Sequence, residues 1–330
     1  MQLKEPTQRN GRREFLQVLA AGALGLTAMG AAGAKAMRGV FPIGQTPFTE
    51  DDNLDPQCLA AEVRFCNRGG VHGFAWPQIA SGWSTLSPAE RLDGAEAILA
   101  AGKGGKTALV IGVQTQGSDL EGSVKYARHA AKNGADAIVS LPPEKAGDQA
   151  MIEYYKAIGA ATELPLIVQS QGEMSVDLIV EMFRQIPTMK CVKDEAGDPL
   201  QRVAQIRERT ADKLAVFSGN GVRTMIDEMR LGFAGHCPFS GIADLYAAAF
   251  DLWHAGKRRD AFDMFGRILA FNSIAGSGAY VLAARGIFKE TTRSRPAPGM
   301  TARSGRPLDE AGKQAIREAL NTYLKPYLRG

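Results

Sequence analysis

Residues 190–198, which read K-C-V-K-D-E-A-G-D, contain a lysine placed where it could act as a nucleophile. The first four residues fit a short buried strand, and the acidic, glycine-containing stretch after them fits a turn. Lys193 is therefore predicted to be the last residue of a strand. Its stem then lies among apolar neighbours, and loss of water disfavours the charged ammonium form. A neutral amine is a nucleophile, whereas a lysine that extends from a sheet edge into water only solubilises that edge.

A repeated strand and helix pattern surrounds this lysine. From Gly39 onward, short apolar runs alternate with longer amphipathic ones, eight times in all. The predicted strands are 40–45, 72–76, 108–113, 137–141, 166–169, 190–193, 214–218 and 234–239. The predicted helices lie near 55–68, 88–102, 119–133, 149–162, 175–185, 199–209, 221–230 and 242–255. The pattern predicts an α/β fold, a (β/α)8 or TIM barrel, in which active residues gather at the C-terminal ends of the strands.

The first 36 residues differ in composition from the rest of the chain. Arg12 and Arg13 are followed by E-F-L, then by a small-residue apolar run over 18–33 and an A-K-A sequence that fits a cleavage site. This pattern predicts a twin-arginine export signal and a periplasmic or other extracytoplasmic location. A buried first helix is the weaker alternative, because a run of Ala and Gly buries little surface. No stop-transfer segment follows, so no membrane partner is expected after signal removal.

Net charge bears on whether the chain binds nucleic acid, and the cysteine positions bear on whether it forms disulfides. Five basic and two acidic residues in this segment carry +3 of the formal net charge of +4, so the remainder is nearly neutral. A nearly neutral chain has no electrostatic motive to bind nucleic acid. Cys58 and Cys66 lie on one predicted helix, about 12 Å apart along its axis, and Cys191 and Cys237 lie on strands that are not neighbours. Four free and mostly buried thiols are expected.

Only helices are predicted after Gly256. They lie near 258–273, 277–288 and 308–327, with a connection rich in Pro, Gly and Arg at 292–306. The predicted organisation is an export signal at 1–36, a barrel at 39–256 and a C-terminal helical extension at 257–330.

Several short motifs together resemble the dihydrodipicolinate synthase and N-acetylneuraminate lyase family of Schiff-base-forming barrel enzymes. They are T-P-F at 46–48, T-L-S-P-x-E-R at 85–91, A-R-H-A at 127–130 with N-G-A-D-A at 133–137, V-K-D with G-D at 192–198, and F-S-G at 217–219. Ser87 and Glu90 also fit a capping box on physical grounds. The resemblance extends over about residues 39–328 and implies that Lys193 is the Schiff-base lysine.

The loop after the second predicted strand departs from the family pattern. Family members have G-T-T-G-E there, where hydroxyl and backbone N–H groups hold a 2-oxo acid carboxylate. This chain has Gln78-Ile79-Ala80-Ser81-Gly82. Ser81 supplies one hydroxyl if the loop shifts by one residue, and backbone N–H groups can bind an anion. A loop that binds no carboxylate is an equal alternative.

A second departure concerns proton transfer. The family writes Tyr-Asn-x-Pro on strand five and uses the phenol to shuttle protons, whereas this chain has Gln169-Ser170-Gln171-Gly172. An amide can hydrogen-bond a substrate but cannot give up a proton near neutral pH. The family's arginine in the neighbouring loop is also missing. Glu195 and Glu144 are the ionisable candidates to replace the relay, although a carboxylate at either position is more often a solvated loop residue, and that alternative is favoured for each.

Together these features define the predicted site. Its catalytic residues are Lys193, Gln169 and Glu195. Its substrate-binding residues are Thr46, Gln78, Ala80, Ser81, Asn220 and Phe239. No histidine pair has metal-ligand spacing, and neither a metal nor a cofactor is predicted.

The function that follows is a divergent Schiff-base-forming lyase, an aldolase or dehydratase, acting on a 2-oxo acid or sugar-acid-like keto compound. The missing relay tyrosine and arginine argue against true dihydrodipicolinate synthesis. The alternative is a non-catalytic periplasmic barrel that binds a keto acid or sugar acid. The resemblance also implies a homodimer or homotetramer.

Overall fold

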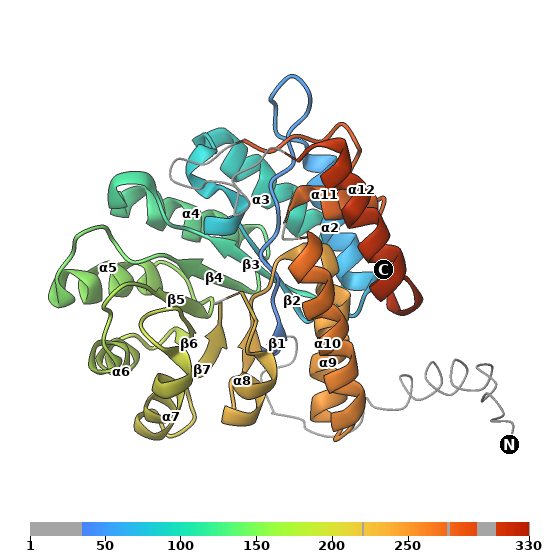
Figure 1. Ribbon diagram of the computed structural model, residues 1–330. Coiled ribbons are helices and arrows are strands. Elements are labelled where there is room, and N and C mark those ends of the chain that lie inside the picture. Colours follow the sequence, from blue (N-terminus) through green and yellow to red (C-terminus); the bar gives the residue numbers. More distant parts are fainter. Residues whose placement is uncertain (1–34, 220, 276–277, 296–307, 330) are drawn as a thin grey trace, which may run out of the picture. The chain divides into compact units, whose positions relative to one another are not determined.

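Parallel strands close into a barrel in the computed structural model, which describes residues 35–219, 221–275, 278–295 and 308–329. Eight strands lie side by side in the order β1-β8-β7-β6-β5-β4-β3-β2. A parallel bridge between Ile43 and Ala75 joins the first strand segment to β2 and so closes the ring. Helices surround these strands (Figure 1). The predicted (β/α)8 barrel is confirmed.

The elements follow the predicted alternation. The strands are β1 (Gly39–Val40), β2 (Gly73–Trp76), β3 (Ala108–Gly112), β4 (Ala137–Ser140), β5 (Leu166–Ser170), β6 (Met189–Asp194), β7 (Ala215–Ser218) and β8 (Gly235–His236). The helices around them are α2 (Pro56–Arg68), α3 (Pro88–Gly102), α4 (Leu120–Lys132), α5 (Asp148–Ala160), α6 (Val176–Gln185), α7 (Pro199–Arg209), α8 (Met225–Leu231) and α9 (Ala243–His254).

Two strands are shorter than the sequence pattern predicts. β1 and β8 contain two residues each, because Pro42 and Pro238 follow soon after and a proline has no N–H to donate to the ladder. Pairing resumes beyond them, since the Ile43 N–H donates to the Pro238 carbonyl at 2.8 Å. The barrel therefore stays closed where the regular strands stop.

The helix starts show the local chemistry that the sequence predicted. At α3 the Glu90 N–H donates to the Ser87 hydroxyl at 3.2 Å, and the Ser87 N–H donates to the Glu90 carboxylate at 2.8 Å. This reciprocal pair confirms the predicted capping box. At α2 the Asp55 carboxylate accepts the N–H groups of Gln57 and Cys58, and Pro56 occupies the first helical position.

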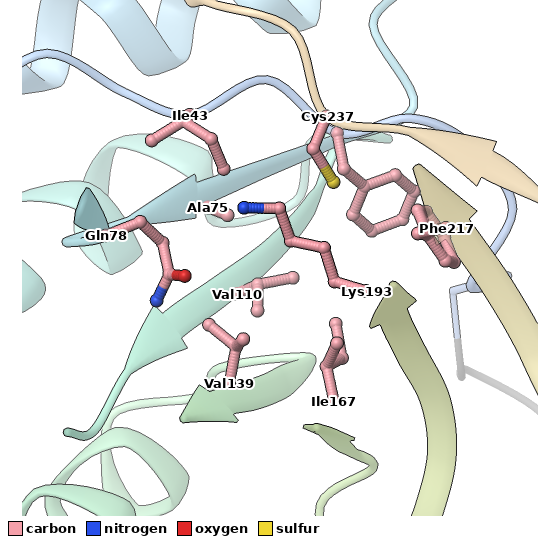
Figure 2. A pocket seen from close by; sticks show the side chains of 10 residues that line it. Ile43, Ala75, Gln78, Val110, Val139, Ile167, Lys193, Phe217 and Cys237 are labelled. Carbon is pink, nitrogen blue, oxygen red and sulfur yellow. The ribbon is translucent and has the colours of Figure 1, made fainter. Parts of the chain in front are cut away.

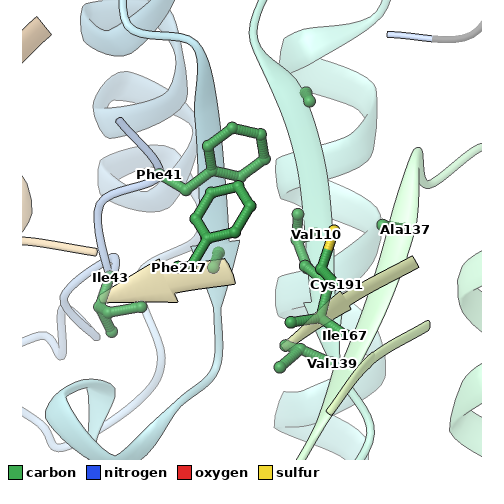
Figure 3. Packing of buried hydrophobic residues seen from close by; sticks show 10 residues of the cluster. Phe41, Ile43, Val110, Ala137, Val139, Ile167, Cys191 and Phe217 are labelled. Atoms are coloured by element: carbon green, nitrogen blue, oxygen red, sulfur yellow. The ribbon is translucent and has the colours of Figure 1, made fainter. Parts of the chain in front are cut away.

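Apolar side chains fill the barrel interior. Phe41 and Phe217 meet edge to face, with ring centroids 5.0 Å apart, and both are buried. The same buried cluster, whose packing Figure 3 shows, also contains Ile43, Ala75, Ala108, Val110, Ala137, Val139, Ile167 and Cys191. This hydrophobic cluster packs below the polar side chains at the C-terminal ends of the strands.

A helical region follows the barrel, as predicted. It consists of α10 (Arg258–Ala275), α11 (Ala279–Ala284) and α12 (Glu310–Ala319), continued by a π-helical turn and a 3-10 turn to Tyr327. Asp244 at the start of α9 is fully buried and accepts two bonds from the Arg285 guanidinium, at 2.8 and 2.9 Å. It also accepts the Arg329 N–H at 2.9 Å. This carboxylate therefore ties the C-terminal region to the barrel.

The predicted export signal lies mostly outside the described residues, since residues 1–34 are not among them, and the three-part organisation of the chain stays a prediction. Lys35, the second-last residue of that segment, pairs with Asp136 at 3.0 Å. Within the described part of the chain, no helix is long and apolar enough to cross a membrane. The four cysteines are free, as expected, and Cys237 alone among them is partly exposed.

Glu62 on α2 is a fully buried carboxyl group beneath the loop that follows β1. It accepts the Gln45 N–H at 3.0 Å. Burial raises the pKa of Glu62 to about 8, and the neighbouring Ser240 hydroxyl and Gln45 amide offset this only in part. The folded protein therefore holds this proton at pH values where the unfolded chain has lost it.

Glu62→Gln is expected to weaken the fall in stability with rising pH. The ordinary pKa of 4.5 and the folded value of about 8 mean that the stabilisation is complete below pH 4.5 and decreases between these values. The upper limit is about 1.4 kcal/mol per pH unit. Glutamine keeps the acceptor for Gln45 and carries no charge. Melting temperatures between pH 5 and 8.5 should fall less than in the wild type, and equal slopes would contradict this account. The exposed Glu208→Gln is the matched control.

Candidate active site

Lys193 lies at the C-terminal end of β6, inside the barrel. The strand ends at Asp194, one residue later than predicted. Alternation along the strand directs Cys191 and Lys193 toward the barrel axis, with Lys193 in register between Gln169 on β5 and Phe217 on β7. Its side chain is 8% exposed and extends into a pocket (Figure 2). The lysine is therefore not a solvated group at the sheet edge.

Glu195 and Gln169 surround the lysine amine. Glu195 Oε1 lies 3.2 Å from Lys193 Nζ, and the Glu195 side chain is 20% exposed. The other carboxylate oxygen, Oε2, accepts a hydrogen bond from Gln169 Nε2. One oxygen is thus fixed by an amide while the second faces the amine. The three predicted catalytic residues are brought together, and their catalytic roles stay a prediction.

Ser170 fixes the backbone that carries Glu195. Its hydroxyl accepts the N–H groups of Glu195 at 3.1 Å and Ala196 at 3.3 Å, and donates to Asp194 Oδ1. The Asp194 carboxylate is fully buried and also accepts Arg202 Nε at 2.9 Å. The turn after β6 is thereby held to both β5 and α7, which positions the Glu195 side chain over the barrel mouth.

The pocket beside Lys193 is mainly apolar. It contains about 300 Å³ of empty space, a volume that includes open solvent at its mouth. Two polar side chains, Gln78 and Lys193, line it together with Phe41, Ile43, Ala75, Val110, Val139, Ile167, Phe217 and Cys237. Figure 2 shows the Gln78 carboxamide and the Lys193 amine on facing parts of this lining.

Hydroxyl groups in the loops after β1 and β2 are engaged in structural hydrogen bonds. Thr46 Oγ1 donates to the Ser81 carbonyl at 2.6 Å and accepts Trp76 Nε1 at 3.0 Å. Ser81 Oγ donates to the Gly44 carbonyl at 2.6 Å and accepts the Gln78 N–H at 3.0 Å. Neither Thr46 nor Ser81 is among the residues that line the pocket, and Ala80 is exposed. Of the four predicted ligands in this region, Gln78 alone lines it.

The remaining predicted residues lie elsewhere. Phe239 is half-buried at the start of a 3-10 helix, Ser240–Ile242, and does not line the pocket. Asn220 lies outside the described residues. Glu144, the other candidate for a proton relay, is exposed, and its backbone N–H donates to Ser118.

His236 on β8 faces the helices rather than the barrel axis. Its Nδ1 lies 2.7 Å from Glu228 Oε2 on α8. Burial alone raises the pKa of Glu228, but hydrogen bonds from His236, Ser218 and Thr224 outweigh it and lower the pKa. This cluster packs α8 against the barrel, so His236 is a core residue.

Cys237 and Gln114 are not among the site residues that the sequence predicts. Cys237 lines the pocket, and burial raises the pKa of its thiol to about 12, so it stays neutral. Period-two alternation along the predicted strand 234–239 could have placed Cys237 on the inner face. No sequence signal links Gln114 to Gln78, because their contact joins the ends of two different strands.

The site combines an amine and a carboxylate in an apolar recess, an arrangement suited to covalent attack on a carbonyl group. Within the described residues, no group of three or more His, Cys, Asp or Glu side chains is arranged to hold a metal ion.

Comparison with known proteins bears on these observations. The model of the Dihydrodipicolinate synthetase family matches residues 36–281. A 4-hydroxy-tetrahydrodipicolinate synthase of Methanosarcina mazei is 30% identical over 196 residues, which cover 57% of this chain and 65% of that protein. The corresponding protein of Rhizobium meliloti is 28% identical over 207 residues, 60% of this chain and 67% of that protein. The alignments thus span only about two thirds of these relatives.

Two solved structures share the fold. The dihydrodipicolinate synthase of Rhodopseudomonas palustris has a TM-score of 0.76 at 20% identity, covering 87% of this chain and 98% of that one. The N-acetylneuraminate lyase of Mycoplasma synoviae has a TM-score of 0.75 at 18% identity, with the same coverage.

Gly219→Ala is expected to separate the lysine from its carboxylate. A Cβ at Gly219 would lie 2.1 Å from Glu195 Oε1 and 2.3 Å from Lys193 Cε. Both are parts of flexible side chains, so these should move while the barrel stays folded. A crystal structure of the variant should place Nζ and Oε1 more than about 4 Å apart.

The matched control is Gly266→Ala, at an exposed position of α10 with no atom within 4 Å of the new Cβ. It should stabilise the protein by about 0.5–1 kcal/mol and leave the pair intact. An unchanged Lys193–Glu195 distance in Gly219→Ala would show that the pair does not depend on this glycine.

Proposed function

Because this chain belongs to the dihydrodipicolinate synthetase family, we propose that it is a Schiff-base-forming lyase in which Lys193 attacks the carbonyl carbon of a keto compound. The observation that supports this most directly is the position of the Lys193 amine, which lines a mainly apolar pocket 3.2 Å from the Glu195 carboxylate. The proposed reaction type is aldol cleavage or condensation, or dehydration.

The pair of side chains supplies both a nucleophile and an acid. Two opposite charges are poorly solvated in an apolar recess, and entry of a substrate removes more water from them. Transfer of one proton from the Lys193 ammonium to Glu195 leaves a neutral amine beside a neutral carboxylic acid. In this proposal Glu195 takes over the proton transfer that the relay tyrosine performs in the family.

The covalent steps then follow from this starting state. The amine nitrogen bonds to the carbonyl carbon, and the carbonyl oxygen takes up the proton released by the nitrogen. Glu195 protonates the resulting hydroxyl, which leaves as water and gives a cationic iminium beside a carboxylate. The iminium accepts the electron pair of an adjacent C–C or C–H bond as that bond breaks, and Glu195 accepts the proton released from the substrate. The enamine formed in this way then takes up a proton from Glu195 on carbon in aldol cleavage, bonds through that carbon to a second carbonyl group in condensation, or expels a neighbouring hydroxyl, protonated by Glu195, as water in dehydration. Each of these changes restores a cationic iminium, which water hydrolyses to release the product and free Lys193.

We further propose that this protein does not perform dihydrodipicolinate synthesis. None of the described residues lining the pocket is a tyrosine or an arginine. The proposed substrate class, a keto compound, includes the 2-oxo acids and sugar-acid-like compounds that the sequence predicts as substrates. The homodimer or homotetramer also remains a proposal.

Reductive trapping tests the nucleophile. Incubation with a panel of ketones and sodium cyanoborohydride should give a stable adduct on Lys193, detected by peptide mass spectrometry. Lys193→Met should abolish that adduct, since no other amine lines the described pocket. Glu195→Gln should form it about 10²–10⁴ times more slowly, because an amide cannot transfer the protons.

Lys190→Met is the matched control, because Lys190 lies on the same strand with an exposed side chain. It should leave trapping on Lys193 unchanged. Ligand-dependent melting shifts without any adduct on Lys193 would instead support a binding protein that does not catalyse a reaction.

Export remains a separate proposal, supported by the sequence around Arg12 and Arg13. Replacing both arginines with lysine should retain the protein in the cytoplasm of a bacterium that has a twin-arginine pathway. Fractionation and immunoblotting provide the measurement, and periplasmic recovery of the doubly substituted protein would contradict the proposed signal.

A further inference from the structure

Gln78 presents a buried hydrogen-bond acceptor with no donor in the described part of the chain. The residue is 1% exposed, follows β2 and lines the same pocket as Lys193. Its amide oxygen, Oε1, has no hydrogen-bonding partner. Buried polar atoms in native proteins are nearly always paired, so an unpaired one at a pocket wall is a position where a bound donor, from a ligand or from water, would be stabilised.

Contacts on the nitrogen side fix the orientation of this amide. Gln78 Nε2 donates to the Pro77 carbonyl at 3.1 Å and to Gln114 Oε1 at 3.3 Å. Gln114 Nε2 donates to the same Pro77 carbonyl at 2.8 Å, which leaves the Gln114 oxygen as the acceptor for Gln78. A carbonyl oxygen only accepts, so the NH2 end of Gln78 must face these groups. The oxygen is therefore the end of this side chain that lacks a partner among the described residues.

Gln169, whose side chain lies near the Lys193 amine, also has an amide oxygen without a hydrogen-bond donor among the residues that the structure describes. Gln169 is fully buried, and its Nε2 is held by the Glu195 carboxylate. Its Oε1 likewise has no partner among the described residues. The amide oxygens of Gln78 and Gln169 thus both lack a hydrogen-bond donor among the described residues. A ligand that carries hydroxyl groups could donate hydrogen bonds to them.

The charges around the pocket oppose a carboxylate ligand. Among the described lining residues Lys193 is the one cation, and Glu195 already balances it at 3.2 Å. The hydroxyls of Thr46 and Ser81 donate to backbone carbonyls rather than to the pocket. Among the lining side chains, the carboxylate of a 2-oxo acid would therefore meet no unpaired cation and would lie beside phenylalanine, isoleucine and valine.

We propose that the pocket takes an uncharged hydroxyketone or hydroxyaldehyde, whose hydroxyl group donates a hydrogen bond to Gln78 Oε1 while Lys193 attacks its carbonyl carbon. This inference rests on the proposed Schiff-base function and specifies its substrate class. The covalent steps are those of the proposed Schiff-base reaction: a C–N bond forms between Lys193 and the substrate, and the carbonyl oxygen leaves as water.

Three ketones that differ in a single group provide the test. Acetone, hydroxyacetone and pyruvate carry a methyl, a hydroxymethyl or a carboxylate group beside the same acetyl unit. Each is incubated with the full chain and sodium cyanoborohydride, and the rate of adduct formation on Lys193 is divided by the rate on Nα-acetyllysine. This division removes the intrinsic difference in carbonyl reactivity. The normalised rate should be about tenfold higher for hydroxyacetone than for acetone, as one hydrogen bond to a buried acceptor provides, and pyruvate should be the slowest.

Gln78→Leu removes the acceptor and should bring the hydroxyacetone rate down to that of acetone. Gln149→Leu, at an exposed position of α5, is the control and should keep the preference. If Gln78→Leu does not fold, because Gln114 loses its partner, the wild-type panel alone decides the question.

The outcomes separate the two proposals. A normalised pyruvate rate above that of hydroxyacetone, or equal rates for all three ketones, overturns the assignment of an uncharged hydroxylated substrate and leaves the Schiff-base function standing. Absence of any adduct on Lys193 overturns the Schiff-base function, and the substrate assignment with it.

Discussion

The proposed active site of this barrel depends on the contact between the Lys193 amine and the Glu195 carboxylate, 3.2 Å apart beside an apolar core. Neither group alone is well accommodated there, because an isolated charge is poorly solvated among hydrophobic side chains. Together they can exist as an ion pair or, after one proton transfer, as two neutral groups. The second arrangement contains the nucleophile and the acid that carbonyl chemistry requires.

The surrounding structure holds this pair from several elements. Ser170 on β5 binds the backbone of Glu195, and the buried Asp194 joins β6 to Arg202 on α7. Gln169 orients the carboxylate, and Gly219 leaves the space that the lysine stem and the carboxylate fill. The parallel barrel supplies the frame, since it aligns the C-terminal ends of β5, β6 and β7 around one axis.

The sequence predicted the barrel and the position of Lys193 because both follow from local pattern, an alternation of strands and helices and a lysine at a strand end. It predicted β1 and β8 too long, since apolar periodicity does not show where Pro42 and Pro238 interrupt a ladder. The engagement of Thr46 and Ser81 and the unpaired oxygen of Gln78 could not be predicted. Each depends on which backbone carbonyl a distant loop presents, and no periodicity encodes that.

The proposed function requires that Lys193 form a covalent bond to a carbonyl carbon with Glu195 as its proton carrier. A crystal structure of the protein after reduction in the presence of a ketone tests it most directly. The account predicts continuous electron density from Lys193 Nζ to the ligand carbon inside the pocket, with a Glu195 oxygen within about 3.2 Å of the ligand or the nitrogen. An empty pocket with Lys193 unmodified, or density on a lysine at the surface, would contradict it.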